Sequence, residues 1–187
     1  NRSNDELEKT QLKITTGLKI NGPKDDASTY AIAQRMRGDI AGMQAVKIAL
    51  AAGESTLNVA ITAGKAITEM LLEMKAKIVQ ANQAGLNTDS RTALNDDFTA
   101  LRDQIETMVA TAEFNGKNLI TSGGTNLSVL STVDGSTIAV TKQTLDATTL
   151  GIATTALTAS ANADTALTEI DAAINSVTTS LAALGAA

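Results

Sequence analysis

Hydrophobic residues recur at heptad spacing along residues 27–83, and no proline interrupts them. One row takes every seventh residue, and a companion row stands three residues further on. The apolar members of these two rows are Met36, Met43, Val46, Leu50, Leu57, Ile67, Leu71, Met74 and Ile78. The spacing predicts a single helix of about 85 Å, at about 1.5 Å of rise per residue. Because a helix of that length cannot bury its own seam, partner helices must lie along it.

Two further segments have the same periodicity and supply those partners. The first, residues 88–112, has its apolar positions at Leu94, Phe98, Leu101, Ile105 and Met108. The second begins near Ser160, and its rows are Leu167, Ile170, Ile174, Val177, Leu181 and Leu184. A connection of only a few residues around Gly85 makes the first partner antiparallel to the long helix. The pattern therefore predicts a mainly α fold: an elongated antiparallel bundle of one very long helix and two shorter partners.

Glycines lie inside the long helix at positions 38, 42, 53 and 64. Each costs roughly 1 kcal/mol of helix propensity relative to alanine. They are either tolerated in an ordinary bundle core or required for close approach by a neighbour, and the sequence leaves both readings open.

Breaking residues separate the helices. Residues 1–18 read as a short polar helix, Gly22 and Pro23 favour a turn, and Asp25 and Asp26 stand where acidic side chains cap a first turn. From residue 121 to 160, 16 of 40 residues are Ser or Thr, and the helical period disappears. Residues 129–133 and 136–140 flank Asp134-Gly135, which predicts a β-hairpin with a tight turn. The rest of this stretch has no clear period.

Composition argues against several classes of function. The chain has a net charge of −5, a pI near 4.7 and no cluster of basic residues, so nucleic acid and anionic membranes are poor partners. No apolar run approaches the roughly 20 residues that span a bilayer, and no cleaved signal is visible. Histidine and cysteine are absent. Neither a cofactor, a metal site nor enzymatic activity is therefore expected.

Three stretches of the chain, in order, contain recognisable motifs. Residues 14–21 read ITTGLKIN and are followed by KDDA at 24–27 and AIAQRM at 31–36. Residues 112–119 read AEFNGKNL, and residues 166–174 read ALTEIDAAI, with LGA at 184–186. Together these stretches resemble bacterial flagellin: the first is similar to the family's N-terminal signature, the second to the close of its second helix, and the third to its C-terminal core helix.

This resemblance implies a structural subunit that is exported unfolded through the flagellar type III channel, without a cleaved signal, and assembles with identical subunits outside the cell into a helical tube for swimming. It implies that residues 1–26 end an inner-tube helix and form a spoke, with Asn21, Lys24, Asp25 and Asp26 in the spoke. Residues 27–112 and 160–187 would be the outer-tube helices, and 113–159 a hairpin and variable insert. The chain resembles a core piece without polymerising termini, expected to be monomeric in dilute solution; an export chaperone is left open.

Flagellins sensed by a vertebrate Toll-like receptor have a stretch that corresponds here to residues 71–80. Its equivalents are Glu73, Met74, Lys77 and Ile78, and the charges at 73 and 77 imply evasion of that receptor. The Ser/Thr-rich insert is either O-glycosylated or an unmodified polar loop. Two alternatives to flagellin are a hook–filament junction protein and a signalling coiled coil. The short insert and Phe114-Asn115-Gly116 favour flagellin, and the strand-like sequence of 121–160 disfavours an unbroken coiled coil.

Overall fold

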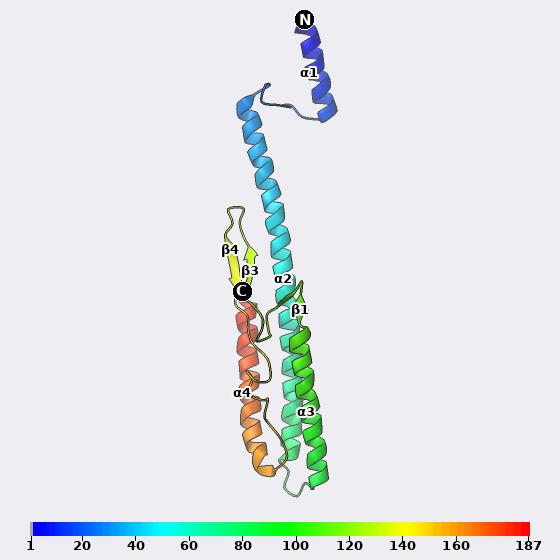
Figure 1. Cartoon of the computed structure of the whole chain (residues 1–187), viewed down its shortest axis with the longest axis vertical. Helices are drawn as coiled ribbons and strands as arrows, with labels where there is room; N and C mark the ends of the chain where they lie inside the picture. The colour runs from blue at the N-terminus through cyan, green and yellow to red at the C-terminus, as the bar shows by residue number, and fades with distance from the viewer. Residues whose placement is uncertain (1) are drawn as a thin grey trace.

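The computed structural model describes residues 2–187, together with their side chains except those of residues 2–5, 160 and 161. Asn1, which the sequence assigns to the first helix, lies outside the described residues. The molecule is a slender rod built on α2 (Ala27–Ala81), as Figure 1 shows. Two helices, α3 (Thr88–Thr111) and α4 (Ser160–Gly185), lie along the C-terminal half of α2. The predicted mainly α, elongated antiparallel bundle is confirmed.

Polar side chains set the ends of α2 and the start of α3. Asp26 caps α2, because its Oδ1 accepts the backbone N–H groups of Ser28 and Thr29 at 3.1 Å. The carbonyl of Ala81, the last residue of α2, accepts a bond from the buried guanidinium of Arg91. Asn87 caps α3 by accepting the N–H of Ser90 at 2.7 Å. Gly85 has φ +87° and lies in the turn between the two helices, not at the end of α2 itself.

The core lies where the heptad seams of α2, α3 and α4 meet, in the lower half of the rod as drawn in Figure 1. Side chains of the seam that are fully buried there are Ile67, Leu71, Met74, Ile78, Phe98, Ile105, Ile170 and Val177. Polar pairs confirm that α4 runs antiparallel to α2. Lys75 Nζ bonds Asp171 Oδ1 at 2.6 Å, and Asn82 Nδ2 bonds Asp164 Oδ1 at 3.0 Å.

The segment between the strands and α4, residues 141–159, completes this core although it has almost no regular structure. Its buried apolar side chains are Leu145, Ala147, Leu150, Ile152 and Leu157. Polar groups of α3 hold its backbone: Glu106 accepts the N–H of Ala147 at 2.7 Å, and Asn95 accepts that of Leu157 at 2.8 Å. The sequence pattern does not assign this role.

Two small hairpins stand between α3 and this segment. The first pairs β1 (Glu113–Phe114) with β2 (Lys117–Asn118) around Asn115 and Gly116, which both have positive φ, 51° and 72°. The second pairs β3 (Leu127–Leu130) with β4 (Thr137–Val140), in register Leu130 opposite Thr137.

The predicted tight turn at Asp134-Gly135 is wrong, because the strands stop earlier and residues 131–136 form a longer loop. The Ser131 N–H and hydroxyl both donate to the Ser136 carbonyl, at 2.8 and 3.0 Å, and close this loop at its base. Within the loop, the Gly135 N–H donates to the Thr132 carbonyl at 3.2 Å. These bonds satisfy backbone groups that the expected strand extensions would have paired with each other.

The N-terminal helix α1 (Arg2–Thr16) stands apart from the bundle, beyond the start of α2 (Figure 1). Residues 17–26 connect α1 to α2 and contain bends, one turn and irregular backbone.

Candidate interaction surface

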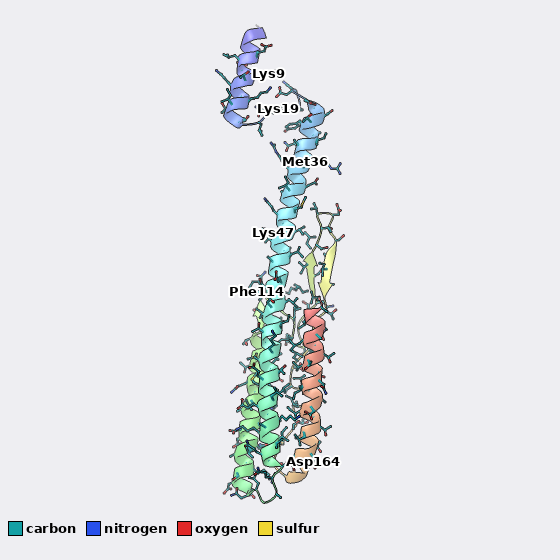
Figure 2. The ribbon with its side chains drawn as sticks, turned by 180° about the vertical axis from the view of Figure 1, so that it is seen from behind. Lys9, Lys19, Met36, Lys47, Phe114 and Asp164 are labelled. Atoms are coloured by element: carbon teal, nitrogen blue, oxygen red, sulfur yellow. The ribbon has the colours of Figure 1, made fainter. Side chains whose placement is uncertain are left out.

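The apolar seam of α2 divides into an exposed half and a buried half. Met36 and Met43 are 59% and 58% exposed, whereas Leu71 and Met74 are 0% exposed. Figure 2 shows Met36 on the part of α2 that extends alone beyond the bundle. The prediction of a buried core seam is therefore not met in the single chain at Met36, Met43 and Leu50, because neither α3 nor α4 reaches this part of α2.

The other predicted seam positions lie in or against the core. Val46 is buried where the loop of the second hairpin meets α2. In α3 and α4, the buried seam residues also include Leu101 and Leu184. Partly buried residues that pack against the core are Leu57, Leu94, Met108, Leu167, Ile174 and Leu181.

We define the N-terminal apolar face as Ile32, Met36, Met43 and Leu50, all exposed. At about 100° per residue, these four positions fall on one side of α2. Asp39 falls among them, one turn from both methionines, and is exposed. Ile48 is 71% exposed but points to a different side of the helix. The face is thus an apolar stripe with one carboxylate in it.

The same end of the molecule includes α1, which has exposed apolar side chains of its own. Leu7 and Ile14, seven residues apart on one side of α1, are 60% and 77% exposed. Among the described side chains of α1, residues 6–16, none belongs to the core. Both N-terminal helices therefore present apolar side chains to solvent.

Residues 17–26, which contain the predicted spoke residues, fold into a hydrogen-bonded turn. The Thr16 hydroxyl donates to Asn21 Oδ1 at 2.8 Å, and the Asn21 N–H donates to Asp25 Oδ2 at 3.2 Å. The Asp25 N–H donates to the Gly22 carbonyl at 3.1 Å, and Lys24 is exposed. The buried Nδ2 of Asn21 has no hydrogen-bond partner within the described part of the chain.

Asp26, at the end of this turn, has a perturbed carboxyl group. The Thr29 hydroxyl donates to Asp26 Oδ2 at 2.6 Å. This bond, and then the bond from the Thr29 N–H, hold the pKa of Asp26 below its usual value, because they favour the charged carboxylate.

The four residues that correspond to the receptor-sensed stretch of other flagellins differ in their exposure to solvent. Met74 and Ile78 are completely buried, so neither can contact another molecule. Glu73 is exposed, and Lys77 Nζ lies 2.7 Å from Asp97 Oδ2 on α3. The hydrogen bond to Asp97 raises the pKa of Lys77. The charge at position 77 therefore already has a partner within the chain.

Three glycines of α2, spaced eleven residues apart, form close contacts that the sequence left open. A Cβ added to Gly42, Gly53 or Gly64 would lie 2.6 Å from an atom of Val133, Val129 or Leu181, respectively. Gly38 has no such neighbour within 4 Å. The first two contacts fix the second hairpin on α2. The regular spacing of these three glycines is the sequence signal that could have predicted the close contacts.

Residues 2–187 contain no group of three or more His, Cys, Asp or Glu side chains that could hold a metal ion. Among the helices described, none is long and apolar enough to cross a membrane.

Comparison with known proteins identifies the family. A model described as the bacterial flagellin N-terminal helical region matches residues 1–125. Flagellin FljM of Caulobacter vibrioides is 41% identical over 186 residues, which cover 99% of this chain and 68% of that protein. A flagellin of Brucella melitensis biotype 1 is 32% identical over 189 residues, covering 96% of this chain and 65% of that protein. The crystal structure of Bacillus cereus flagellin superposes with a TM-score of 0.63 at 27% identity, covering 71% of this chain and 77% of that one.

These matches favour neither the junction-protein nor the signalling alternative. The chain belongs to the bacterial flagellin family, and it is a structural subunit of the extracellular flagellar filament.

Proposed function

We propose that further helices cover the N-terminal apolar face in the assembled filament. The observation that supports this is the change of exposure along a single seam, from 59% at Met36 to 0% at Met74. Fully burying one large aliphatic side chain contributes roughly 1.5–3 kcal/mol. A filament that covers Ile32, Met36, Met43 and Leu50 would gain that contribution at each of them.

Asp39 makes this surface selective. It lies between Met36 and Met43 on the same side of α2, so any helix that covers the methionines also approaches the carboxylate. A buried and unpaired carboxylate is strongly destabilising. We therefore expect the partner helix to be mainly apolar, with a polar or cationic group opposite Asp39.

We propose the following division of the chain in the filament. Residues 1–26 end an inner-tube helix and form a spoke, residues 27–112 and 160–187 form the outer tube, and residues 113–159 form the hairpins and insert. The separation of α1 from the bundle supports this division, as does the turn that joins α1 to α2 (Figure 1). Asn21, Lys24, Asp25 and Asp26 are the spoke residues.

In dilute solution we propose that this chain is monomeric. The N-terminal apolar face is one row of side chains on one helix, and a stable pairwise interface buries about 1,200–2,000 Å² in total. In a filament several neighbours surround each subunit, whereas a pair in solution gives each chain only one neighbour. Light scattering after size exclusion should give the mass of one chain, and a stable dimer would contradict this proposal.

We also propose that the chain is exported unfolded. The chain has no cysteine, so no disulfide prevents it from being extended for passage through a flagellar type III channel. The partners after export are identical subunits. An export chaperone that covers the exposed apolar side chains of α1 and α2 before assembly would suit this surface, and we propose no catalytic role.

We further propose that Glu73 and Lys77 weaken recognition by the vertebrate Toll-like receptor. Glu73 presents a negative charge to solvent, and Lys77 can meet a receptor only by sharing or losing its partner Asp97. Potent activation of receptor-reporter cells by this subunit would contradict the proposal.

The packing surface is tested by charge substitution. Met36→Glu/Met43→Glu adds two carboxylates to the face, while Ile48→Glu adds one to another side of the same exposed helix. Each variant would replace the flagellin of a motile bacterium and be examined by electron microscopy. We expect Ile48→Glu to give filaments and the double variant to give none. Filaments of normal length from the double variant would disprove the proposed surface.

A further inference from the structure

An Asn-Gly pair forms the turn of the first hairpin, at the C-terminal end of α3 (Figure 1). Asn115 and Gly116 have φ of 51° and 72°, and the strands on either side pair Phe114 with Lys117. Two left-handed residues in a two-residue hairpin loop form a type I′ turn. Asn115 is also the one residue other than glycine that has a positive φ in the described part of the chain.

The same pair of residues can react within itself. The Gly116 nitrogen attacks Asn115 Cγ, a new C–N bond forms, and the bond from Cγ to the side-chain nitrogen breaks. That nitrogen leaves as ammonia with the proton of the Gly116 N–H, and a five-membered succinimide remains. Water then opens the ring at either carbonyl and gives aspartate or isoaspartate. Glycine favours the attack because it has no Cβ to obstruct its nitrogen.

The folded turn prevents this ring closure. The five-membered ring requires the Gly116 nitrogen to lie on the same side of the Cα–C bond of Asn115 as Cβ does. In a type I′ turn the first central residue has ψ of about 30°, the mirror image of type I. This angle places the next nitrogen nearly opposite Cβ, so the pair can cyclise only after the hairpin opens.

We propose that Asn115 is a deamidation site that the closed first hairpin protects, so that the reaction belongs to the unfolded chain and to subunits whose hairpin has opened. Both strands of this hairpin are only two residues long. Short, exposed elements open at a lower free energy than the core does. Protection of Asn115 therefore follows the hairpin and not the global stability of the bundle.

Isoaspartate carries the main chain through its side chain and thus adds one methylene group to the backbone of the turn. A two-residue turn with this insertion cannot keep the register of β1 and β2, and the displacement reaches Asn118. The Nδ2 of Asn118 donates to the carbonyl of Val109, in the last turn of α3, at 2.7 Å. Its Oδ1 accepts the backbone N–H groups of residues 120 and 121 at 2.9 and 3.1 Å. Isoaspartate therefore weakens the end of α3, whereas aspartate adds a charge and suits the same turn.

The reaction is measured on the purified subunit at mildly alkaline pH, both folded and unfolded in guanidinium chloride. Peptide mass spectrometry follows the loss of the side-chain amide at each asparagine. In the denaturant, Asn115 and Asn21, which also precedes a glycine, should convert at similar rates because the sequence alone determines them. In the folded protein we expect Asn115 to convert about tenfold more slowly than in the denaturant, or slower still. Equal rates in the two states would overturn the inference, as would a resistant Asn115 in the denaturant.

The role of the hairpin is tested at Asn118. Asn118→Ala removes all three of its bonds, and Asn118→Asp removes only the donor to α3 if the first variant fails to fold, which circular dichroism determines. Either folded variant should deamidate Asn115 several-fold faster than the unmodified chain. Asn58→Ala, at an exposed position of α2, is the control and should leave the rate unchanged. An unchanged rate in the Asn118 variants would overturn protection by the hairpin.

The effect of the added methylene group is measured against Asn115→Asp, which has the same charge and an ordinary backbone. The isoaspartate form is separated by chromatography, refolded, and followed by thermal denaturation. We expect its midpoint to lie below that of Asn115→Asp, and faster amide exchange at residues 111 and 112 at the end of α3. Equal midpoints and equal exchange would overturn the consequence assigned to isoaspartate.

Discussion

Val129 of β3 packs against Gly53 of α2 so closely that a Cβ on the glycine would lie 2.6 Å from Val129 Cγ2 and 3.4 Å from its Cβ. Val133 packs against Gly42 in the same way, eleven residues nearer the N-terminus of α2. A valine side chain has little freedom to move aside, because its methyl groups branch directly from Cβ. These two glycines therefore determine how closely the second hairpin approaches α2.

Gly53→Ala should destabilise the protein although alanine is the better helix former. Overpacking costs typically 1–3 kcal/mol, and the gain in helix propensity offsets about 1 kcal/mol of that. We expect the free energy of unfolding to fall by up to about 2 kcal/mol, measured by urea denaturation. Gly38→Ala is the matched control, because Gly38 has nothing within 4 Å; it should raise the free energy of unfolding. Equal stabilisation by both substitutions would contradict the close packing.

Arg91 stabilises the turn between α2 and α3. Its guanidinium is buried and donates to the carbonyl of Ala81, where α2 ends. Arg91→Met keeps most of the aliphatic packing but leaves that carbonyl without its donor, which should lower the free energy of unfolding by about 1–3 kcal/mol. The control is Arg35→Met on the exposed part of α2, where we expect little change. Thermal or urea denaturation followed by circular dichroism measures both variants.

The capping of α2 by Asp26 depends on pH. The hydroxyl of Thr29 is the largest cause of the lowered pKa of this carboxyl group. A folded-state pKa below the unfolded value means that the carboxylate stabilises the fold above the unfolded pKa, and that this contribution is lost as pH falls through the folded pKa. NMR titration should therefore place the pKa of Asp26 below 3.8, the ordinary value for an aspartate. In Thr29→Val the transition should move upward, and an unchanged titration would rule out the hydroxyl as the cause.

Glu106 holds the irregular segment against α3. Its carboxylate accepts the N–H of Ala147 at 2.7 Å. Glu106→Ala removes a hydrogen bond worth about 1 kcal/mol, so the Ala147 amide should exchange faster with solvent. Gln104→Ala, at an exposed neighbouring position of α3, serves as the control. Native-state hydrogen exchange measures this directly, and unchanged protection of Ala147 in Glu106→Ala would contradict the role assigned to the carboxylate.

The helices could be predicted from sequence because their periodicity is strong and their ends are marked. The bounds of α2 and α3 differ from the expected 27–83 and 88–112 by only one or two residues, and the cap at Asp26 was recognisable. Residues 141–159 could not be assigned in this way. Leu145, Leu150, Ile152 and Leu157 have no regular spacing, and their backbone is held by side chains of α3 that lie far away in the sequence.

The exposed half of the α2 seam shows a different limit of sequence reasoning. A heptad row that will pack within its own chain looks the same as one that will pack elsewhere. Met36 and Leu71 occupy equivalent positions in the pattern, five heptads apart, yet one is exposed and the other is fully buried. Only the three-dimensional arrangement distinguishes them, because it shows where α3 and α4 end.

The thickness of the rod changes abruptly along its length. Above the second hairpin, α2 is a single helix, and below it several elements pack side by side (Figure 1). Because the resistance of a rod to bending rises steeply with its width, a force applied through α1 will curve residues 27–41 before it deforms the bundle. Within this chain, residues 27–41 are thus the part that bends, which lets α1 tilt while the spacing of side chains in the bundle stays constant.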